Sequence, residues 1–543
     1  MKKELSILLL NPMDPKDGNS WYYNDVVTRY LKNFKFKVLK FILRLVVGLF
    51  SKEFILKSKF LRTKRKATYP PLPLISAASY FPKHWYFKIF DENVEGEISK
   101  YNVDINKFDY IFVTGMIIHQ KEVKRIIKFC KENDKKIIAG GPLVSSLPDE
   151  FIEIDSIVIN EVENIIPSLV NDLENETLQK RYFSAERPNL EKSFKVPRFD
   201  LINWSDYGSA TIQTARGCPF NCTFCGVIVK DGRKVRTINS SQLIQQLDEL
   251  HEFFKSGSVF LVNDNFIGTN SKITKKILEA IIMWQKEKHY PYKFMIQASV
   301  DMAEDADLVK MIVEANITRV FFGFETPNQE ILENYQKIQN LKINLPEIIK
   351  FFLNNGIEVL SGLVYGNLLD TEKTYRYLLD FNSTGNVLIM PAILTALPET
   401  EMWKEFKKKG MLLENNYGGS QGDIGLNFKH PNAKKIIKLY KSLHVEFYSI
   451  KNFYKRVEEF SKDYKHKAIN QKINFGSIMA FVKSIFYLGI CSRELIYYWK
   501  TIIKTIFSKE KIKSFAEIVE YMISGHKYFK VARKLKKQLA SEN

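Results

Sequence analysis

Short apolar runs alternate with stretches of helical periodicity along two separate parts of this chain. In the first part the runs lie at residues 5–10, 86–90, 110–114, 136–139 and 157–159, and residues 122–133 between them have a helical pattern. Buried strands that alternate with helices are typical of a parallel sheet whose crossover helices cover both faces. We therefore predict a doubly wound, Rossmann-like domain over residues 1–175.

A second series of apolar runs begins after a polar connector at residues 176–205. Its strand candidates lie at residues 210–213, 258–262, 294–298, 319–323, 358–363 and 387–393. Six repeats of strand and helix predict an open, partial (β/α)6 barrel over residues 206–430. Residues 431–543 are basic and helical in pattern, without glycine-rich turns that would indicate strands. The predicted fold class is α/β with a helical C-terminal region.

Residues 27–66 do not follow this alternation of strand and helix patterns, and they are predicted to be an insert in the first domain. Lys37, Lys40 and Arg44 recur at helical spacing, with apolar residues such as Leu39 and Val46 on other faces. A basic amphipathic helix of this kind lies on an anionic membrane or docks on the body of the protein with its lysines in water. The sequence leaves both alternatives open.

The composition limits the class of protein. The chain has 543 residues, of which 45% are apolar, so several hydrophobic cores are expected and general disorder is excluded. No run reaches the roughly 18 uncharged apolar residues that span a bilayer, because Arg44 interrupts the best candidate. The first residues are expected to form a strand and not a signal peptide. The predicted location is the cytoplasm, with peripheral attachment to the inner face of the membrane left open.

Three of the five cysteines, Cys218, Cys222 and Cys225, lie in the segment T-A-R-G-C-P-F-N-C-T-F-C-G, directly after a predicted strand. In a chain this poor in cysteine, such a cluster indicates a reducing compartment and a metal or catalytic use. Three thiolates on a four-iron cluster leave one iron free for another ligand. A structural zinc site requires a fourth ligand, and the nearest histidine in the sequence is His251. The three cysteines are therefore predicted to hold a 4Fe-4S cluster, whereas Cys130 and Cys491 are given no role.

At these cysteines the sequence resembles the radical S-adenosylmethionine superfamily, whose signature has this spacing and an aromatic residue before the last cysteine, here Phe224. The resemblance implies that the free iron chelates S-adenosylmethionine and that reduction, by a donor such as a flavodoxin or ferredoxin, yields a 5'-deoxyadenosyl radical. It also implies that Phe224 packs near the adenine. Simple loop packing is the alternative for this ring.

The resemblance extends to polar residues at the ends of later strands. In the family such residues hold the amino group and ribose of S-adenosylmethionine, which implies roles for Asp264 in V-N-D-N-F, for Ser299, and for Glu325 in F-G-F-E-T. Each of them taken alone is equally compatible with a surface cap or a salt-bridge partner. The usual Gly-Gly-Glu run after the second strand is absent, so the amino-group contact stays open.

Small residues follow the predicted strands of the first domain, in T-G-M-I-I-H and A-G-G-P-L-V-S-S. Ligands of open parallel sheets bind beyond the carboxyl ends of the strands, so Gly140, Gly141, Ser145 and Ser146 are candidate ligand contacts. A plain strand-to-helix turn is the alternative.

With the second domain identified, the first domain resembles the cobalamin-binding modules fused to many radical enzymes. The resemblance implies cobalamin as a further cofactor. The D-x-H-x-x-G run that supplies a lower cobalt ligand in some cobalamin proteins is missing, and the domain has only His84 and His119. We assign neither histidine to cobalt.

The segments V-P-R-F-D, L-T-A-L-P-E-T and G-D-I-G-L-N-F are similar to those of the branch that contains hopanoid methylases and tetraether-lipid ring synthases. This implies a cobalamin-dependent methyltransferase that transfers a methyl group to an unactivated carbon of a lipid-like or other small-molecule substrate. Cyclisation, epimerisation or oxidation with the same cofactors is the first alternative.

Nucleic acid is the other alternative, because the formal net charge of +20 attracts RNA as well as anionic lipid. An RNA-modifying radical enzyme of the methylthiotransferase type would need a second cysteine trio upstream, and a nucleic-acid-binding iron-sulfur protein would need a fully ligated cluster. Helix-turn-helix and zinc-finger spacings are also absent from the sequence. We therefore do not expect nucleic acid as a partner.

Overall fold

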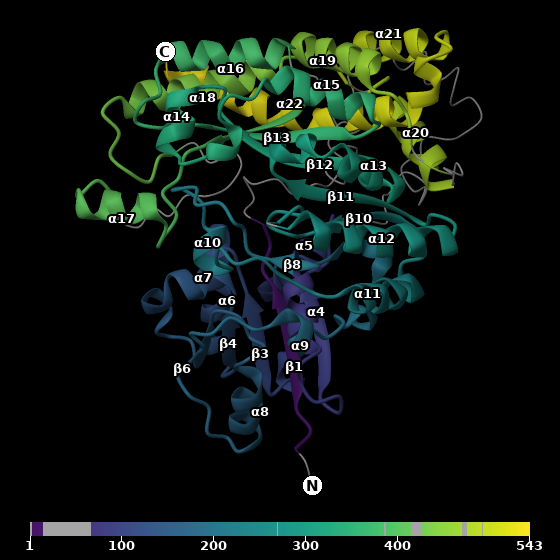
Figure 1. Ribbon diagram of the computed structural model, residues 1–543. Coiled ribbons are helices and arrows are strands. Elements are labelled where there is room, and N and C mark those ends of the chain that lie inside the picture. The colour runs from purple at the N-terminus through teal and green to yellow at the C-terminus, as the bar shows by residue number, and fades with distance from the viewer. Residues whose placement is uncertain are drawn as a thin grey trace, which may run out of the picture.

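The computed structural model describes residues 3–14, 67–101, 103–268, 270–384, 387–413, 425–467, 469, 475–490 and 492–542. The predicted insert at residues 27–66 lies outside these residues. The chain forms two parallel sheets, drawn one above the other in Figure 1, and the C-terminal helices lie over the upper sheet. The predicted fold class is confirmed.

The first sheet has six parallel strands in the order β2-β1-β3-β4-β5-β6. The strands are β1 (Ser6–Asn11), β2 (Tyr86–Asp91), β3 (Tyr110–Thr114), β4 (Lys136–Gly140), β5 (Ser156–Ile159) and β6 (Arg181–Phe183). Leu8 and Leu10 of β1 belong to one buried cluster, whereas Ile7 and Leu9 belong to another on the opposite face. A strand that is buried on both faces reads as a continuous apolar run, which is why the sequence predicted these strands well.

Helices cover both faces of the first sheet. They are α4 (Leu72–Ala78), α5 (Glu92–Glu95), α6 (Gln120–Glu132), α7 (Pro142–Ser146) and α8 (Ile166–Glu174). α6 and α7 pack on one face, and α4 and α8 pack on the other. β2, the next strand in sequence, lies on one side of β1 in the sheet, and β3 lies on its other side. The direction in which successive strands are added to the sheet therefore reverses at β1. Ligands of such sheets bind beyond the carboxyl ends of the strands near this point.

The boundary expected at residue 175 is too early, because β6 pairs with β5 as the last strand of the first sheet. The sequence missed β6 because only Tyr182 among its three residues is buried. A short edge strand with one buried residue has no periodicity to detect. The predicted polar connector is therefore structured in part, and it also contains α9 (Leu190–Ser193).

The second sheet also has six parallel strands, in the order β14-β13-β12-β11-β10-β7. They are β7 (Ala210–Ile212), β10 (Gly257–Leu261), β11 (Tyr292–Ala298), β12 (Ile317–Glu325), β13 (Glu358–Tyr365) and β14 (Leu388–Ile393). The helices of this part are α10 (Val227–Lys230), α11 (Ser240–Phe253), α12 (Ser271–Glu287), α13 (Ala306–Glu314), α14 (Gln329–Asn334), α15 (Leu345–Asn354), α16 (Glu372–Thr384) and α17 (Glu401–Lys408). All six strands coincide with the predicted runs.

The C-terminal helices close the free edge of the second sheet. They are α18 (Ala433–Phe447), α19 (Ile450–Asp463), α20 (Phe475–Tyr487), α21 (Leu495–Ile506) and α22 (Phe515–Glu542). β14 is an edge strand, and its outward carbonyls accept hydrogen bonds from the C-terminal helices. Nε2 of His444 lies 3.2 Å from the Pro391 oxygen, and the Tyr448 hydroxyl donates to the Ile389 oxygen. Burial lowers the pKa of His444 to about 4, so this imidazole is neutral at physiological pH. An edge strand covered in this way cannot pair with another chain. Within the described ranges, none of the helices is long and apolar enough to cross a membrane.

The crossing of α19 and α22 depends on a glycine. A Cβ atom built on Gly525 would lie 1.9 Å from the Phe453 ring, which is fully buried. We expect Gly525→Ala to lower the free energy of unfolding by about 1–3 kcal/mol, because overpacking forces the helices apart. Anaerobic thermal unfolding measures this change. Equal melting temperatures for Gly525→Ala and the unchanged protein would contradict the close helix crossing.

Candidate active site

The cysteines lie in a loop whose two ends are held together. β8 (Ala215–Arg216) pairs antiparallel with β9 (Arg236–Thr237). The two ends of the loop formed by residues 217–235 therefore lie side by side. The Cys218 nitrogen donates to the Gly232 oxygen at 3.1 Å. Gly217 has a φ of +97°, and a Cβ atom there would lie 2.7 Å from the Lys234 oxygen. The loop can therefore close tightly only with glycine just before the first cysteine.

Each of the three sulfur atoms is paired with an N–H donor. The backbone N–H of Phe220 donates to Cys218 and that of Val227 donates to Cys225. The side-chain amide of Gln339 lies 3.8 Å from the Cys222 sulfur. N–H donors to sulfur stabilise bound thiolates and tune the potential of iron-sulfur clusters.

The thiols are buried and lie within electrostatic reach of one another. Burial raises the pKa of Cys225 to about 11 and also raises the pKa of Cys218, and the charge of Cys222 adds to both effects. Iron binds the thiolate form of cysteine. The positive charge of bound iron would therefore lower the pKa values of these three thiols and deprotonate them. Within the described part of the chain, no three His, Cys, Asp or Glu side chains converge on one metal ion. A 4Fe-4S cluster does not need such convergence, because each thiolate binds a different iron. The donor set fits this cluster.

A buried lysine lies beside the cysteines, and the sequence analysis missed it. The Lys337 ammonium lies 2.7 Å from a carboxylate oxygen of Glu325, and both side chains are about nine-tenths buried. Burial opposes the charge of Lys337, but Glu325 and Cys222 outweigh it, so the pKa of Lys337 is raised. No local motif marks this residue. It reaches the cysteines because α14 returns the chain toward them after β12.

Asp264 holds the start of the cysteine loop. Its carboxylate accepts a hydrogen bond of 2.8 Å from the Gly217 nitrogen. Burial, followed by the charge of Asp231, raises the pKa of Asp264 to about 6, although Lys230 opposes the shift. A carboxyl group with such a perturbed pKa is a candidate functional group. Its predicted contact with S-adenosylmethionine stays a prediction.

The other predicted residues lie around the same strand ends. Ser299 follows β11, and its hydroxyl accepts from the Asn265 amide at 3.0 Å. Glu325 ends β12 at an irregularity of the ladder, with a φ of 61°. The Phe224 ring packs edge-on against Tyr335, with 4.8 Å between ring centroids. Their roles toward S-adenosylmethionine also stay predictions.

The carboxyl edge of the first sheet contacts the base of the cysteine loop. Glu161, just after β5, forms ion pairs with Arg216 at 2.6 Å and with Arg236 at 2.7 Å. Glu163 adds a second carboxylate at 2.8 Å from Arg216. Burial disfavours the charge of Arg216, but Glu163 and Glu161 outweigh this effect and raise its pKa. In Figure 1 the strands of the first sheet rise from the N-terminus toward β8, so their carboxyl ends point at the second domain.

The predicted contacts of the first domain lie at this same edge. Gly140 ends β4, and Gly141 is the residue before α7. The Ser145 hydroxyl accepts a hydrogen bond of 3.0 Å from the Asn160 nitrogen, next to Glu161. The structure therefore brings these three residues to the side of the first sheet that faces the cysteines. Among the described residues, no hydrogen bond or ion pair joins these three residues to the cysteine loop.

Two family models match this chain. The Radical SAM superfamily matches residues 212–380, and a domain of unknown function matches residues 400–541. An uncharacterized methyltransferase of Synechocystis sp. is 35% identical over 372 residues, which cover 67% of this chain and 68% of that protein. The hopanoid C-2 methylase of Rhodopseudomonas palustris is 29% identical over 360 residues, which cover 65% of this chain and 67% of that protein.

Solved structures agree in fold. The cobalamin-dependent S-adenosylmethionine radical enzyme OxsB matches with a TM-score of 0.58 at 15% identity, and the match covers 100% of this chain and 81% of that chain. The radical S-adenosylmethionine methyltransferase TsrM from Kitasatospora setae matches with a TM-score of 0.55 at 13% identity, and the match covers 93% of this chain and 100% of that chain. At such identities the likeness concerns the fold alone. From the cysteine loop, the matched family model and the Synechocystis relative, we conclude that the chain belongs to the radical S-adenosylmethionine family.

Proposed function

We propose that this protein is a cobalamin-dependent radical C-methyltransferase. One observation supports this most directly: the ligand-binding edge of the first sheet adjoins the base of the cysteine loop through the Glu161–Arg216 ion pair. A methyl donor held at that edge and a radical formed at the cysteines would therefore lie near each other. The methyltransferase names of the two relatives point to the same reaction.

The residues at this edge suit a corrin that is not ligated by histidine. Both ring nitrogens of His119 are engaged: Nδ1 accepts from the Met116 nitrogen at 3.0 Å, and Nε2 lies 3.1 Å from Asp14. The small residues after β4 leave room for close approach of a large flat ligand. Gly140, Gly141 and Ser145 are the residues that we propose hold cobalamin.

The cofactors supply the radical and the methyl group, and this chain supplies binding, orientation and exclusion of water. Cys218, Cys222 and Cys225 would hold the cluster by three corners. Asp264 fixes the loop that carries them, through its hydrogen bond to Gly217. The buried Lys337 balances negative charge at the thiolates. These residues would hold the cluster in one position.

We further propose that the substrate is lipid-like. Two relatives named as hopanoid methylases, one for C-2 and one for C-3, methylate a lipid. An unactivated carbon of such a substrate needs hydrogen abstraction before a methyl group can be added, which is the task of a radical enzyme. The electron would come from an acidic flavodoxin or ferredoxin, which the net charge of +20 attracts, in the cytoplasm.

Incubation with trideuteromethyl S-adenosylmethionine tests the reaction. Protein purified without oxygen and with cobalamin supplied should release 5'-deoxyadenosine on reduction. Lipid extracts of a deletion strain, used as substrate, should gain one labelled methyl group per product. A product of unchanged carbon count would favour cyclisation, epimerisation or oxidation instead. Absence of deoxyadenosine from cluster-loaded protein would contradict the radical mechanism itself.

A further inference from the structure

One helix of the C-terminal region has an apolar face on the outside of the molecule. Tyr498, Ile502 and Thr505 of α21 point into the protein and are buried. The opposite face carries large apolar side chains with high exposed fractions: Ile496 72%, Trp499 36%, Ile503 53%, Ile506 49% and Phe507 85%. At 3.6 residues per turn, these five residues form one continuous stripe. Contiguous exposed apolar surface of this kind marks an interaction site.

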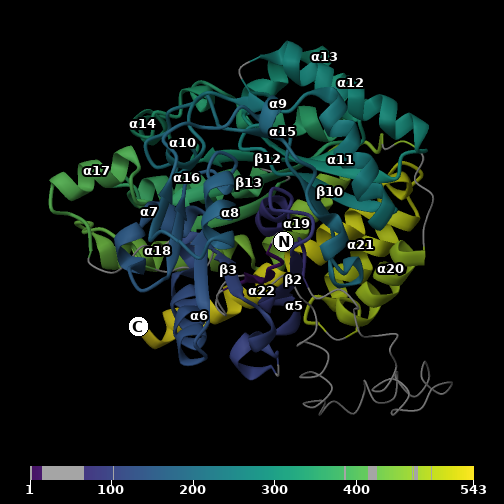
Figure 2. The ribbon, with the colours of Figure 1, turned by 90° about the horizontal axis from the view of Figure 1, so that it is seen from below.

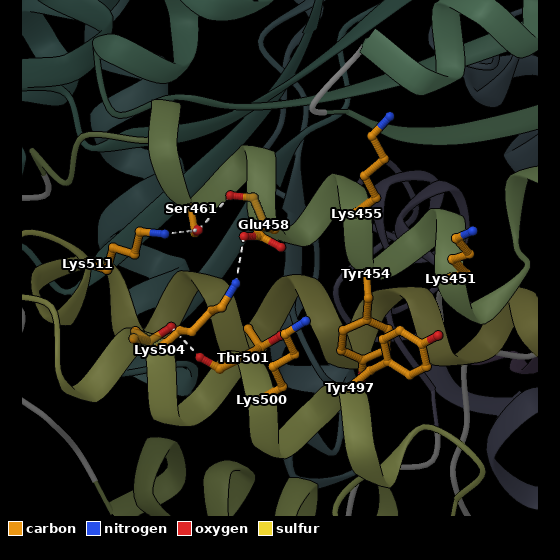
Figure 3. Close-up of a pocket in the computed structure, with 11 residues that line it drawn as sticks. Lys451, Tyr454, Lys455, Glu458, Ser461, Tyr497, Lys500, Thr501, Lys504 and Lys511 are labelled. Atoms are coloured by element: carbon orange, nitrogen blue, oxygen red, sulfur yellow. Dashed lines mark hydrogen bonds and ion pairs between the residues drawn. The ribbon is translucent and has the colours of Figure 1, made fainter.

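Lysines flank this apolar stripe in a groove between α19 and α21. Figure 3 shows side chains of the two helices facing each other across the groove. The lysines that line it are Lys451, Lys455, Lys500, Lys504 and Lys511. The groove has one acidic lining residue, Glu458, which pairs with Lys504 at 2.8 Å.

Most of this positive charge is not neutralised. Lys451, Lys455 and Lys500 have no acidic partner within ion-pair distance among the residues that the structure describes. Lys511 donates to the neutral Ser461 hydroxyl at 3.1 Å. Uncompensated lysines in a groove attract anionic groups, and the attraction is strongest at low ionic strength.

An aromatic pair closes one end of the groove. The rings of Tyr454 and Tyr497 lie 5.5 Å apart, and the Tyr497 side chain is partly exposed beside Lys500. Tyrosine and tryptophan are enriched where proteins meet the headgroup region of membranes, because an apolar ring with a polar end suits that region. Trp499 of the stripe has the same character.

We propose that the α19–α21 face docks this protein onto an anionic phospholipid bilayer. Phosphate headgroups occupy the lysine groove, and the stripe from Ile496 to Phe507 enters the boundary between headgroups and acyl chains. The proposal goes beyond the methyltransferase function and does not depend on it. It concerns a different part of the chain from the insert at residues 27–66, for which the sequence left membrane contact and docking on the protein itself as alternatives.

The three isoleucines of the stripe favour a bilayer over nucleic acid. Single-stranded nucleic acid is bound by positive grooves with aromatic platforms on which bases stack. Exposed Ile496, Ile503 and Ile506 offer no stacking surface, but they do match acyl chains. Arginine, which is preferred for bidentate phosphate contacts, does not line the groove.

Cosedimentation with vesicles tests the proposal. The full-length protein should bind vesicles of phosphatidylglycerol and phosphatidylcholine and should bind pure phosphatidylcholine much more weakly. The variant K451Q/K455Q/K500Q should lose about 100-fold in partition coefficient, because each lysine near an anionic surface contributes about five-fold. The variant I503S/F507S should lose at least about ten-fold even at high salt, because it removes buried apolar area and no charge.

A matched triple variant on α17 controls for the loss of net charge. Figures 1 and 2 place α17 and α21 on opposite sides of the molecule, so K404Q/K407Q/K408Q removes the same charge from a distant face. This variant should bind the anionic vesicles nearly as well as the unchanged protein. All variants change exposed residues and should keep the melting temperature and iron content of the unchanged protein.

Three results would overturn the proposal. The first is equal vesicle binding by the unchanged protein and K451Q/K455Q/K500Q. The second is a sedimentation coefficient that shows self-association and returns to that of a monomer in I503S/F507S, because the apolar face would then join two copies. The third is a loss of affinity for single-stranded RNA in K451Q/K455Q/K500Q without a loss of vesicle binding.

Discussion

Replacing Cys222 with alanine is expected to abolish reductive cleavage of S-adenosylmethionine, with a loss of more than about 100-fold. Two remaining thiolates cannot hold a four-iron cluster in the buried loop, and the Gln339 amide loses its sulfur partner. Iron and sulfide content should fall together. Deoxyadenosine released after reduction with dithionite measures the loss of activity.

Cys130→Ala is the matched control for this change. Cys130 is fully buried on α6, and burial raises the pKa of its thiol to about 12, which keeps it inert. The variant should keep its iron and its cleavage activity and should lose only a little stability. Full iron content in Cys222→Ala, or loss of iron in Cys130→Ala, would show that the cluster is held elsewhere.

Lys337→Met is expected to lower the free energy of unfolding by about 3–5 kcal/mol, because it leaves the Glu325 carboxylate buried without its partner. It should also make the cluster harder to reduce. A positive charge beside the thiols stabilises the reduced cluster, so its removal shifts the reduction potential to more negative values. Anaerobic thermal unfolding and a redox titration followed by electron paramagnetic resonance measure the two effects.

The double variant Glu325→Gln/Lys337→Met separates these two effects. It should regain most of the stability, because neither buried partner then carries an uncompensated charge. The reduction potential should stay below that of the unchanged protein, because the positive charge of Lys337, which acts on the charges of Cys222 and Cys225, is still missing. A potential restored by the double variant would mean that Lys337 serves only the ion pair.

Patterns within single segments allowed much of this fold to be predicted. Except for β6, the strands of both sheets were found because buried parallel strands are apolar on both faces, as Ile7 to Leu10 are. β6 was missed because only Tyr182 in it is buried. The cysteine loop was found because its three ligands lie within one short stretch of chain.

The sequence by itself determined the two α/β domains, the helical C-terminal region and the trio of cysteines, since these depend on local periodicity and spacing. Only the tertiary structure decided that Lys337 lies beside Cys222, that Glu161 of one domain holds Arg216 of the other, and that the lysines of α19 and α21 share one groove. These contacts join residues from separate elements. Their energies depend on burial and on distances across the fold, which no window of sequence contains.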